Sequence, residues 1–242
     1  MIVIKFKSNF YFILCTLILS NCGRPSDPVN TLIRELNRYP EYTLILNDYR
    51  IDDGFFADYF LQFDALTASS KRIDGVDSLV YSQGKTDWIQ VSESIFGRYE
   101  HYVGMVVSSK SIDGSKTSTH QAFPPGYQYV GNPRYGSWGG GGFWQFYGQY
   151  ALMSQLMGGW RVGRSDWDDY RNTRSRGGAY FGPKENGRST FGTRGTQTEK
   201  AKPAFFKRHE QRRKTFGNRV SNRMGQARSG SSWGGRTSRF GK

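Results

Sequence analysis

Residues 42–65 read YTLILNDYRIDDGFFADYFLQFDA and carry the clearest structural signal in the N-terminal half of the chain. Residues 42–51 are mostly β-formers, and Asp52-Asp53-Gly54 supplies turn chemistry. After this turn, apolar residues alternate with more polar neighbours, at Phe55, Ala57, Tyr59, Leu61, Phe63 and Ala65. Because alternate side chains of a strand point to opposite faces, the stretch predicts a β-hairpin with one apolar face.

A short amphipathic helix is predicted just before the hairpin. Asp27-Pro28 combines a capping carboxylate with a proline in the first turn, which is typical of a helix start. Apolar residues then recur at helical spacing, at Val29, Leu32, Ile33 and Leu36. Tyr39-Pro40 ends the pattern, because proline disfavours helical backbone at the residue before it.

Further strands are expected after the hairpin, at residues 76–82, 87–91 and 102–109, with turns at Gly84-Lys85 and Asp113-Gly114. The simplest architecture is an α+β domain in which the N-terminal helix packs on an antiparallel β-meander. We expect this small domain to span residues 22–122, because about 100 residues suffice for one modest core.

The first 21 residues have the features of a lipoprotein signal peptide. Lys5 and Lys7 precede an apolar run over residues 10–19, which is followed by Ser20-Asn21-Cys22. The run is shorter than the roughly 20 apolar residues that a membrane-spanning helix needs, so a cleaved signal is expected instead of a stable anchor helix. The mature chain would then begin at Cys22, whose thiol would carry the lipid.

Cysteine usage agrees with this interpretation. The chain contains two cysteines, Cys15 and Cys22. Cleavage removes the first and lipidation consumes the second, so the mature protein has no thiol for a disulfide or a cysteine zinc site. Acyl chains on Cys22 would bind membrane lipid with about 0.8 kcal/mol per buried CH₂. The predicted localisation is the bacterial cell envelope, and in a diderm organism the outer membrane.

The amino-acid composition of the chain changes after the small domain. Residues 123–142 are rich in Pro, Gly and Tyr, which predicts a linker or an extended strap laid on the domain. Residues 143–159 predict an aromatic helical segment, either buried against the domain or lying at a membrane interface, where aromatic rings are favoured. The candidate interface residues in this segment are Phe143, Trp144, Phe146 and Tyr147.

Basic charge is concentrated in the last third of the chain. Residues 1–160 hold 13 Lys and Arg against 14 Asp and Glu, whereas residues 161–242 hold 21 against 6. The respective net charges of −1 and +15 favour binding of polyanions by the C-terminal part. Residues 160–242 also have few apolar residues in any one window, which predicts a largely disordered basic tail when free.

One segment of this tail has a helix-forming composition. Residues 203–216 are densely basic and predict a helix that forms at a membrane surface, with cations contacting anionic headgroups. The candidate contact residues are Lys207, Arg208, Arg212, Arg213, Lys214 and Arg219. Phe205 and Phe206 are the candidate membrane-interface aromatic residues of the same segment.

No motif predicts catalysis, a cofactor or a metal. Asp166, Asp168 and Asp169 lack the glycine and distal glutamate of a calcium loop, and the histidines have no second ligand at metal-binding spacing. The glycines at 139–142 have neither the dinucleotide-binding nor the P-loop pattern. The paired carboxylates Asp52-Asp53 are explained by the turn of the predicted hairpin and need no catalytic role. We therefore expect a protein that is not an enzyme.

Two aromatic stretches carry a resemblance. They read FPPGYQYVGNPRYG over residues 123–136 and FWQFYGQYA over residues 143–151. With the Arg- and Ser-rich tail, the chain resembles a group of uncharacterised bacterial lipoproteins in which a small domain precedes a Tyr/Gly/Trp-rich strap and a basic tail. The resemblance covers residues 85–242, implies an envelope protein, and brings no catalytic residue.

These features together predict a lipid-anchored envelope protein with a binding or structural role. Its cationic tail would dock on anionic lipids, on other envelope polyanions or on an acidic protein partner. The alternative is an intracellular RNA-binding protein, because Arg176-Gly177-Gly178 and Gly234-Gly235-Arg236 are similar to arginine-glycine segments. Outside the cytoplasm nucleic acid is scarce, so a lipid anchor disfavours that partner. An envelope hydrolase would require a cleft with a charged residue of perturbed pKa.

Overall fold

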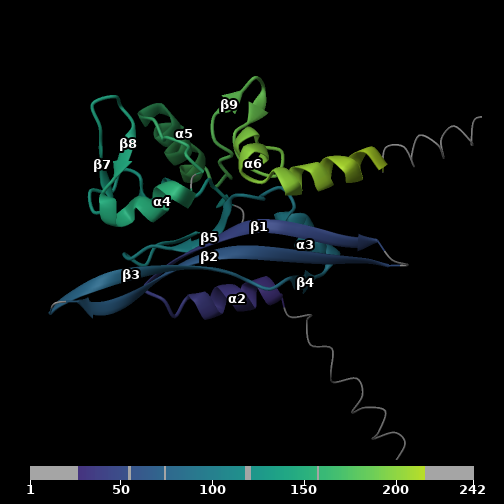
Figure 1. The fold of residues 1–242 in the computed structure, drawn as a ribbon, viewed down its shortest axis with the longest axis horizontal. Helices are drawn as coiled ribbons and strands as arrows, with labels where there is room; N and C mark the ends of the chain where they lie inside the picture. Colours follow the sequence, from purple (N-terminus) through teal and green to yellow (C-terminus); the bar gives the residue numbers. More distant parts are fainter. Residues whose placement is uncertain (1–26, 54–55, 74, 118–120, 157, 216–242) are drawn as a thin grey trace, which may run out of the picture. The chain divides into compact units, whose positions relative to one another are not determined.

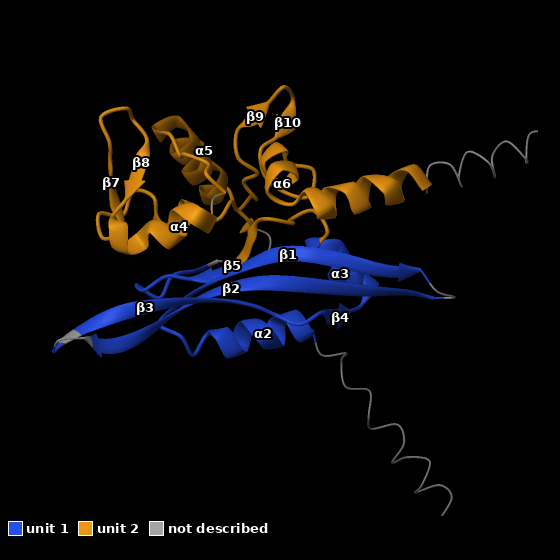
Figure 2. Ribbon diagram, in the orientation of Figure 1, with its two compact units in different colours: residues 1–99, 108–119 blue, residues 100–107, 120–242 orange. Residues whose placement is uncertain are grey.

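The computed structural model describes residues 27–53, 56–73, 75–117, 121–156 and 158–215. These residues form helices and antiparallel sheets, which confirms the α+β class (Figure 1). The chain divides into two compact units (Figure 2). The first unit comprises residues 1–99 and 108–119, and the second comprises residues 100–107 and 120–242. Residues 100–107, which we predicted to lie in the N-terminal domain, therefore group with the second unit.

A six-stranded sheet forms the centre of the first unit. Its strand order is β3-β2-β1-β5-β6, and β4 pairs with β2 beyond the end of β3. The strands are β1 (Glu41–Asp53), β2 (Ala57–Ile73), β3 (Val76–Lys85), β4 (Ile89–Val91), β5 (Val106–Lys110) and β6 (Lys116–Thr117). The chain passes between the two units within β5.

The predicted hairpin is confirmed. β1 and β2 pair antiparallel from Glu41↔Ala68 to Asp53↔Ala57, with one irregularity between Leu46 and Asp48. β2 continues into an antiparallel pair with β3, which completes the meander. The predicted turn at Gly84-Lys85 is wrong, since both residues pair with β2 as part of β3. The long partner strand offers backbone groups that satisfy their hydrogen bonds more completely than a turn would.

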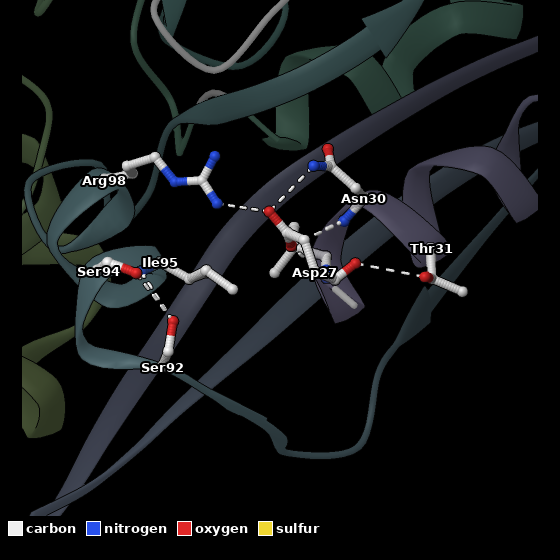
Figure 3. A network of polar contacts seen from close by, with 8 residues as sticks. Asp27, Asn30, Thr31, Ser92, Ser94, Ile95 and Arg98 are labelled. Carbon is white, nitrogen blue, oxygen red and sulfur yellow. Dashed lines mark hydrogen bonds and ion pairs between the residues drawn. The ribbon is translucent and has the colours of Figure 1, made fainter. Parts of the chain in front are cut away.

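The predicted helix is also confirmed, as α2 (Pro28–Leu36). The Asp27 carboxylate accepts the backbone N–H groups of Val29, at 3.0 Å, and Asn30, at 3.1 Å. The same carboxylate pairs with the guanidinium of Arg98, which joins the start of α2 to a second helix (Figure 3). The capping residue thus also fixes the position of the helix within the unit.

That second helix, α3 (Glu93–Tyr99), was not predicted. The Ser92 hydroxyl accepts the backbone N–H of Ile95, which caps the helix (Figure 3). Phe96 and Tyr99 are buried, and Tyr99 contacts Phe63 of β2 edge to face at 6.1 Å between ring centroids. At seven residues, α3 is too short for a clear helical period, and its stability comes from this packing.

The second unit begins with the predicted strap, which is folded. Tyr127–Tyr129 form a 3-10 turn and β7 spans Gly136–Trp138. Large side chains of this stretch are buried, namely Phe123, Tyr127, Tyr129 and Tyr135. Residues 123–142 therefore supply core side chains and do not act as a linker.

The predicted aromatic helix over residues 143–159 is wrong for most of its length. β8 (Trp144–Phe146) pairs antiparallel with β7, and a 3-10 turn covers Gly148–Tyr150. Only α4 (Ala151–Leu156) is α-helical. The reason is local: the glycines at 139–142 form the turn of a hairpin, and aromatic residues favour strands.

The predicted disorder of the tail is wrong for residues 160–215. This stretch contains α5 (Arg164–Ser175), the two-residue strands β9 (Lys184–Glu185) and β10 (Arg188–Ser189), and α6 (Thr196–Ala201). A further helix covers residues 203–215, within the predicted range 203–216. Residues 216–242 lie outside the described residues.

Long-range aromatic packing explains this order. Tyr127 of the strap contacts Tyr170 at 5.4 Å, Tyr180 at 5.6 Å and Phe191 at 6.5 Å between ring centroids. Phe191 also packs with Met105 and Ala122 in a buried cluster. The aromatics that look isolated along the tail thus share one core with residues from earlier in the chain, and their burial offsets the entropy of ordering it.

Candidate functional site

The basic helix over residues 203–215 holds most of the predicted contact residues. Lys207, Arg208, Arg213 and Lys214 are exposed, and Arg212 is half-buried. The Arg213 guanidinium pairs with the Glu210 carboxylate at 2.9 Å. The structure thus brings these cations together on one helix. Arg219 and Cys22, the other two predicted sites, lie outside the described residues.

The aromatic residues of this helix face the protein. Phe205 is only 4% exposed and stacks on His209, with ring centroids 5.8 Å apart. Phe206 is half-buried, and the Arg188 guanidinium lies 5.9 Å from its ring centroid. The prediction that Phe205 meets a membrane is therefore contradicted in this structure, because its ring is already packed against the protein.

The predicted interface residues around β8 divide into two groups. Phe143 and Tyr147 are 38% and 45% exposed, whereas Trp144 is buried and Phe146 is half-buried. Trp144 packs against Trp138 of β7, edge to face at 5.3 Å. Only Phe143 and Tyr147 of these four side chains thus present much aromatic surface to solvent.

Arginine side chains lie over aromatic rings beside this hairpin. The Arg164 guanidinium lies 4.6 Å from the Trp138 ring centroid, and that of Arg171 lies 4.7 Å from Trp167. Both arginines are exposed. Such contacts stabilise by about 0.5–1 kcal/mol at exposed sites and hold the guanidinium in a defined orientation.

A groove of about 770 Å³ lies within the second unit. Its aromatic lining comes from Phe143 and Trp160, and its polar lining includes Arg161, Asp166, Glu185 and Lys200. Every lining residue is exposed or half-buried, so the groove is open to solvent. Sequence reasoning missed this feature, because the lining residues come from segments that are adjacent only after folding.

Gly158 and Gly159 also line the groove. Their φ angles are +61° and +80°, a left-handed conformation that favours glycine. The Gln197 side-chain amide of α6 donates to the Gly158 carbonyl, and Trp160 Nε1 donates to the Tyr127 hydroxyl at 3.1 Å. The Gly-Gly-Trp sequence was the one local signal for this turn.

A partly buried carboxylate, that of Asp166, lines the groove. Asp166 accepts the backbone N–H of Gly163 at 3.3 Å and so caps α5. Burial raises the pKa of Asp166 above its usual value, and the nearby Asp169 carboxylate adds to the rise. Burial also raises the pKa of the Tyr127 hydroxyl above its usual value.

A second carboxylate, Glu185, lines the same groove. It accepts the Thr196 hydroxyl at 3.1 Å and is exposed. General acid–base catalysis needs two groups whose surroundings drive their pKa values apart and leave them aimed at a substrate. Here one carboxylate caps a helix and the other joins β9 to α6, so both are engaged in structural contacts.

Within the described ranges, no group of three or more His, Cys, Asp and Glu side chains is arranged to hold a metal ion. In the same part of the chain, no helix combines the length and apolar content needed to cross a bilayer.

Comparisons with protein families, with curated proteins and with solved structures find no match to this chain.

Proposed function

We propose that this chain is a lipid-anchored protein of the bacterial cell envelope with a non-enzymatic binding role. Acylated Cys22 holds it on a membrane, and the basic helix over residues 203–215 contacts the anionic surface of that membrane. The lipoprotein signal and the net charge of +15 over residues 161–242 support this assignment.

The observation that carries the proposal is the arrangement of side chains on the basic helix. Lys207, Arg208 and Lys214 are exposed, while Phe205 is packed against the protein. Helical spacing places Lys207 and Lys214, seven residues apart, on the same face. A helix that inserts into a bilayer presents its aromatic side to lipid, whereas this helix presents cations. The contact is therefore electrostatic.

Its strength follows from the number of exposed cations. Each Lys or Arg near an anionic leaflet contributes about 1 kcal/mol, so Lys207 and Lys214, which share a face, contribute roughly 2 kcal/mol. This corresponds to a dissociation constant weaker than millimolar for the helix alone. The contact is thus effective only when the lipid anchor keeps the domain at the surface, and it orients the protein more than it retains it.

The anchor is tested by mass spectrometry of the membrane fraction. The expected result is an acylated N-terminal peptide that begins at Cys22. Recovery of a soluble chain that still begins with Met1 refutes the proposal. Release of that soluble chain from a nucleic-acid complex by nuclease would instead support the RNA-binding alternative.

The surface contact is tested in the lipidated protein. The mature chain has no thiol besides Cys22, so Gln211→Cys introduces a single labelling site between Lys207 and Lys214 on the exposed face. Energy transfer from a dye at this position to labelled headgroups should be higher in phosphatidylglycerol vesicles than in phosphatidylcholine vesicles, and should fall with added salt.

Charge reversal identifies the residues responsible. Lys207→Glu with Lys214→Glu should abolish the difference between the two vesicle types. The control variant is Lys71→Glu with Lys116→Glu, which changes the net charge by the same amount at exposed positions of the first unit. This variant should keep the difference between the two vesicle types. Equal transfer in both vesicle types for the unsubstituted protein would refute the docking contact.

A further inference from the structure

The groove of the second unit is lined by two kinds of side chain, aromatic and polar. Phe143 and Trp160 supply aromatic surface. Arg161, Lys200 and Gln197 supply hydrogen-bond donors, while Asp166 and Glu185 supply acceptors. We propose that this groove binds a neutral oligosaccharide. The inference is independent of the lipid anchor and of the basic helix.

The chemistry of the lining favours a saccharide. Sugar hydroxyls both donate and accept hydrogen bonds, so they require the mixture of donors and acceptors that is present here. The C–H face of a sugar ring is apolar and carries partial positive charge, which complements the negative face of an aromatic ring. Phe143 and Trp160 line the same groove. The Arg161 guanidinium covers one face of the Phe143 ring, 4.5 Å from its centroid, so Trp160 is the ring on which a sugar would stack.

The balance of charge argues against ionic ligands. Two cations, Arg161 and Lys200, line the groove together with two carboxylates, Asp166 and Glu185. A polyphosphate would meet the carboxylates, and a polycation would meet the Arg and Lys side chains, at an energetic cost in either case. A neutral, hydroxyl-rich ligand avoids both costs. Because a carboxylate accepts several hydrogen bonds, such a ligand can still donate to Asp166 and Glu185 beside their contacts with Gly163 and Thr196.

The size and openness of the groove suit a chain of sugars. Its volume of about 770 Å³ lies within the range of sites that hold drug-sized ligands. Because every lining residue is exposed or half-buried, the ligand can extend beyond the groove into solvent. An enclosed site for a single small molecule would instead have buried lining residues.

The walls of the groove are tied together before any ligand binds. The Gln197 amide donates to the Gly158 carbonyl, and the Thr196 hydroxyl donates to Glu185. Trp160 is held by its hydrogen bond to Tyr127. Preorganised walls lower the entropy cost of binding, which matters for a ligand that gains little from burial of apolar area.

Isothermal titration calorimetry of the full chain tests the proposal, in a detergent whose headgroup is not a sugar. The probes are N-acetylchitotetraose and cellotetraose, with the zwitterionic peptide Lys-Ala-Ala-Glu as the competing class of ligand. Saturable binding of at least one tetrasaccharide, and none of the peptide, is expected. Absence of saccharide binding, or binding of the peptide alone, overturns the proposal.

Variants locate the binding. Ala201 is an exposed lining residue, so Ala201→Trp fills the groove and should weaken saccharide binding about tenfold or more. Ala204→Trp is the matched control, because Ala204 is exposed and does not line the groove. If Ala201→Trp misfolds, Lys200→Ser serves in its place, since Lys200 is exposed and its truncation leaves the core intact. Undiminished binding by the folded groove variant overturns the proposal.

Discussion

Phe205 anchors the basic helix, and its removal should release that helix from the second unit. The ring is 4% exposed, and truncation of a buried phenylalanine to alanine costs about 3–5 kcal/mol. The helix over residues 203–215 is only thirteen residues long, a length at which an isolated helix is marginal in water. We therefore expect Phe205→Ala to lower the free energy of local opening of this helix by about 3 kcal/mol.

Native-state hydrogen exchange measures this opening directly. A loss of about 3 kcal/mol accelerates amide exchange by roughly a hundredfold, and the acceleration should be confined to peptides covering residues 203–215. Phe206→Ala is the matched control. Its ring is half-buried, so we expect a loss of about 1 kcal/mol and an acceleration of only several-fold.

Two results would refute this reasoning. Unchanged protection in Phe205→Ala would mean that the helix is held by other contacts. Equal acceleration in the Phe205 and Phe206 variants would mean that burial does not set the stability of the helix.

Three further predictions concern the fold. Gly131 has φ +80°, and a Cβ there would lie 2.3 Å from a ring carbon of Trp167, whereas a Cβ at Gly177, with φ +76°, meets nothing within 4 Å. Gly131→Ala should therefore be more destabilising than Gly177→Ala by about 2 kcal/mol in urea unfolding, and equal losses would contradict the close packing. Asp27→Asn keeps an acceptor at the start of α2, so it should destabilise less than Asp27→Ala, by about 1 kcal/mol in thermal unfolding; the reverse order would show that the cap is unimportant. Burial lowers the pKa of His209, so the unfolded state takes up a proton first as the pH falls below 6.5, and the stability present above that pH is lost on acidification. His209→Gln should reduce this pH dependence in urea unfolding, and a variant as pH-dependent as the unsubstituted chain would assign the effect elsewhere.

Local sequence patterns predicted the elements that have strong local causes. The hairpin of residues 42–65 followed from alternation around Asp52-Asp53-Gly54, and α2 followed from Asp27-Pro28 and its apolar spacing. The helix near residues 203–216 followed from composition. The sequence signal for each of these elements lies within a few positions, which is the range over which propensity, capping and periodicity act.

The same reasoning failed where stability depends on partners in other elements of the fold. Residues 143–159 look helical in composition, but Trp144–Phe146 pair with Gly136–Trp138 across a glycine turn. The tail after residue 160 has too little apolar surface to fold alone, yet Tyr170, Tyr180 and Phe191 all pack around Tyr127. The burial of each aromatic ring depends on all the residues that pack around it. A short stretch of sequence contains only a few of those residues.

For the candidate sites, the sequence by itself established the concentration of basic charge and the lipidation candidate at Cys22, because charge and motif are properties of composition and order. Folding determined which side chains of the basic helix face solvent, turning Phe205 inward and leaving Lys207 and Lys214 exposed. Folding also created the groove, since Phe143, Trp160 and Lys200 become neighbours only when the intervening chain packs into one core.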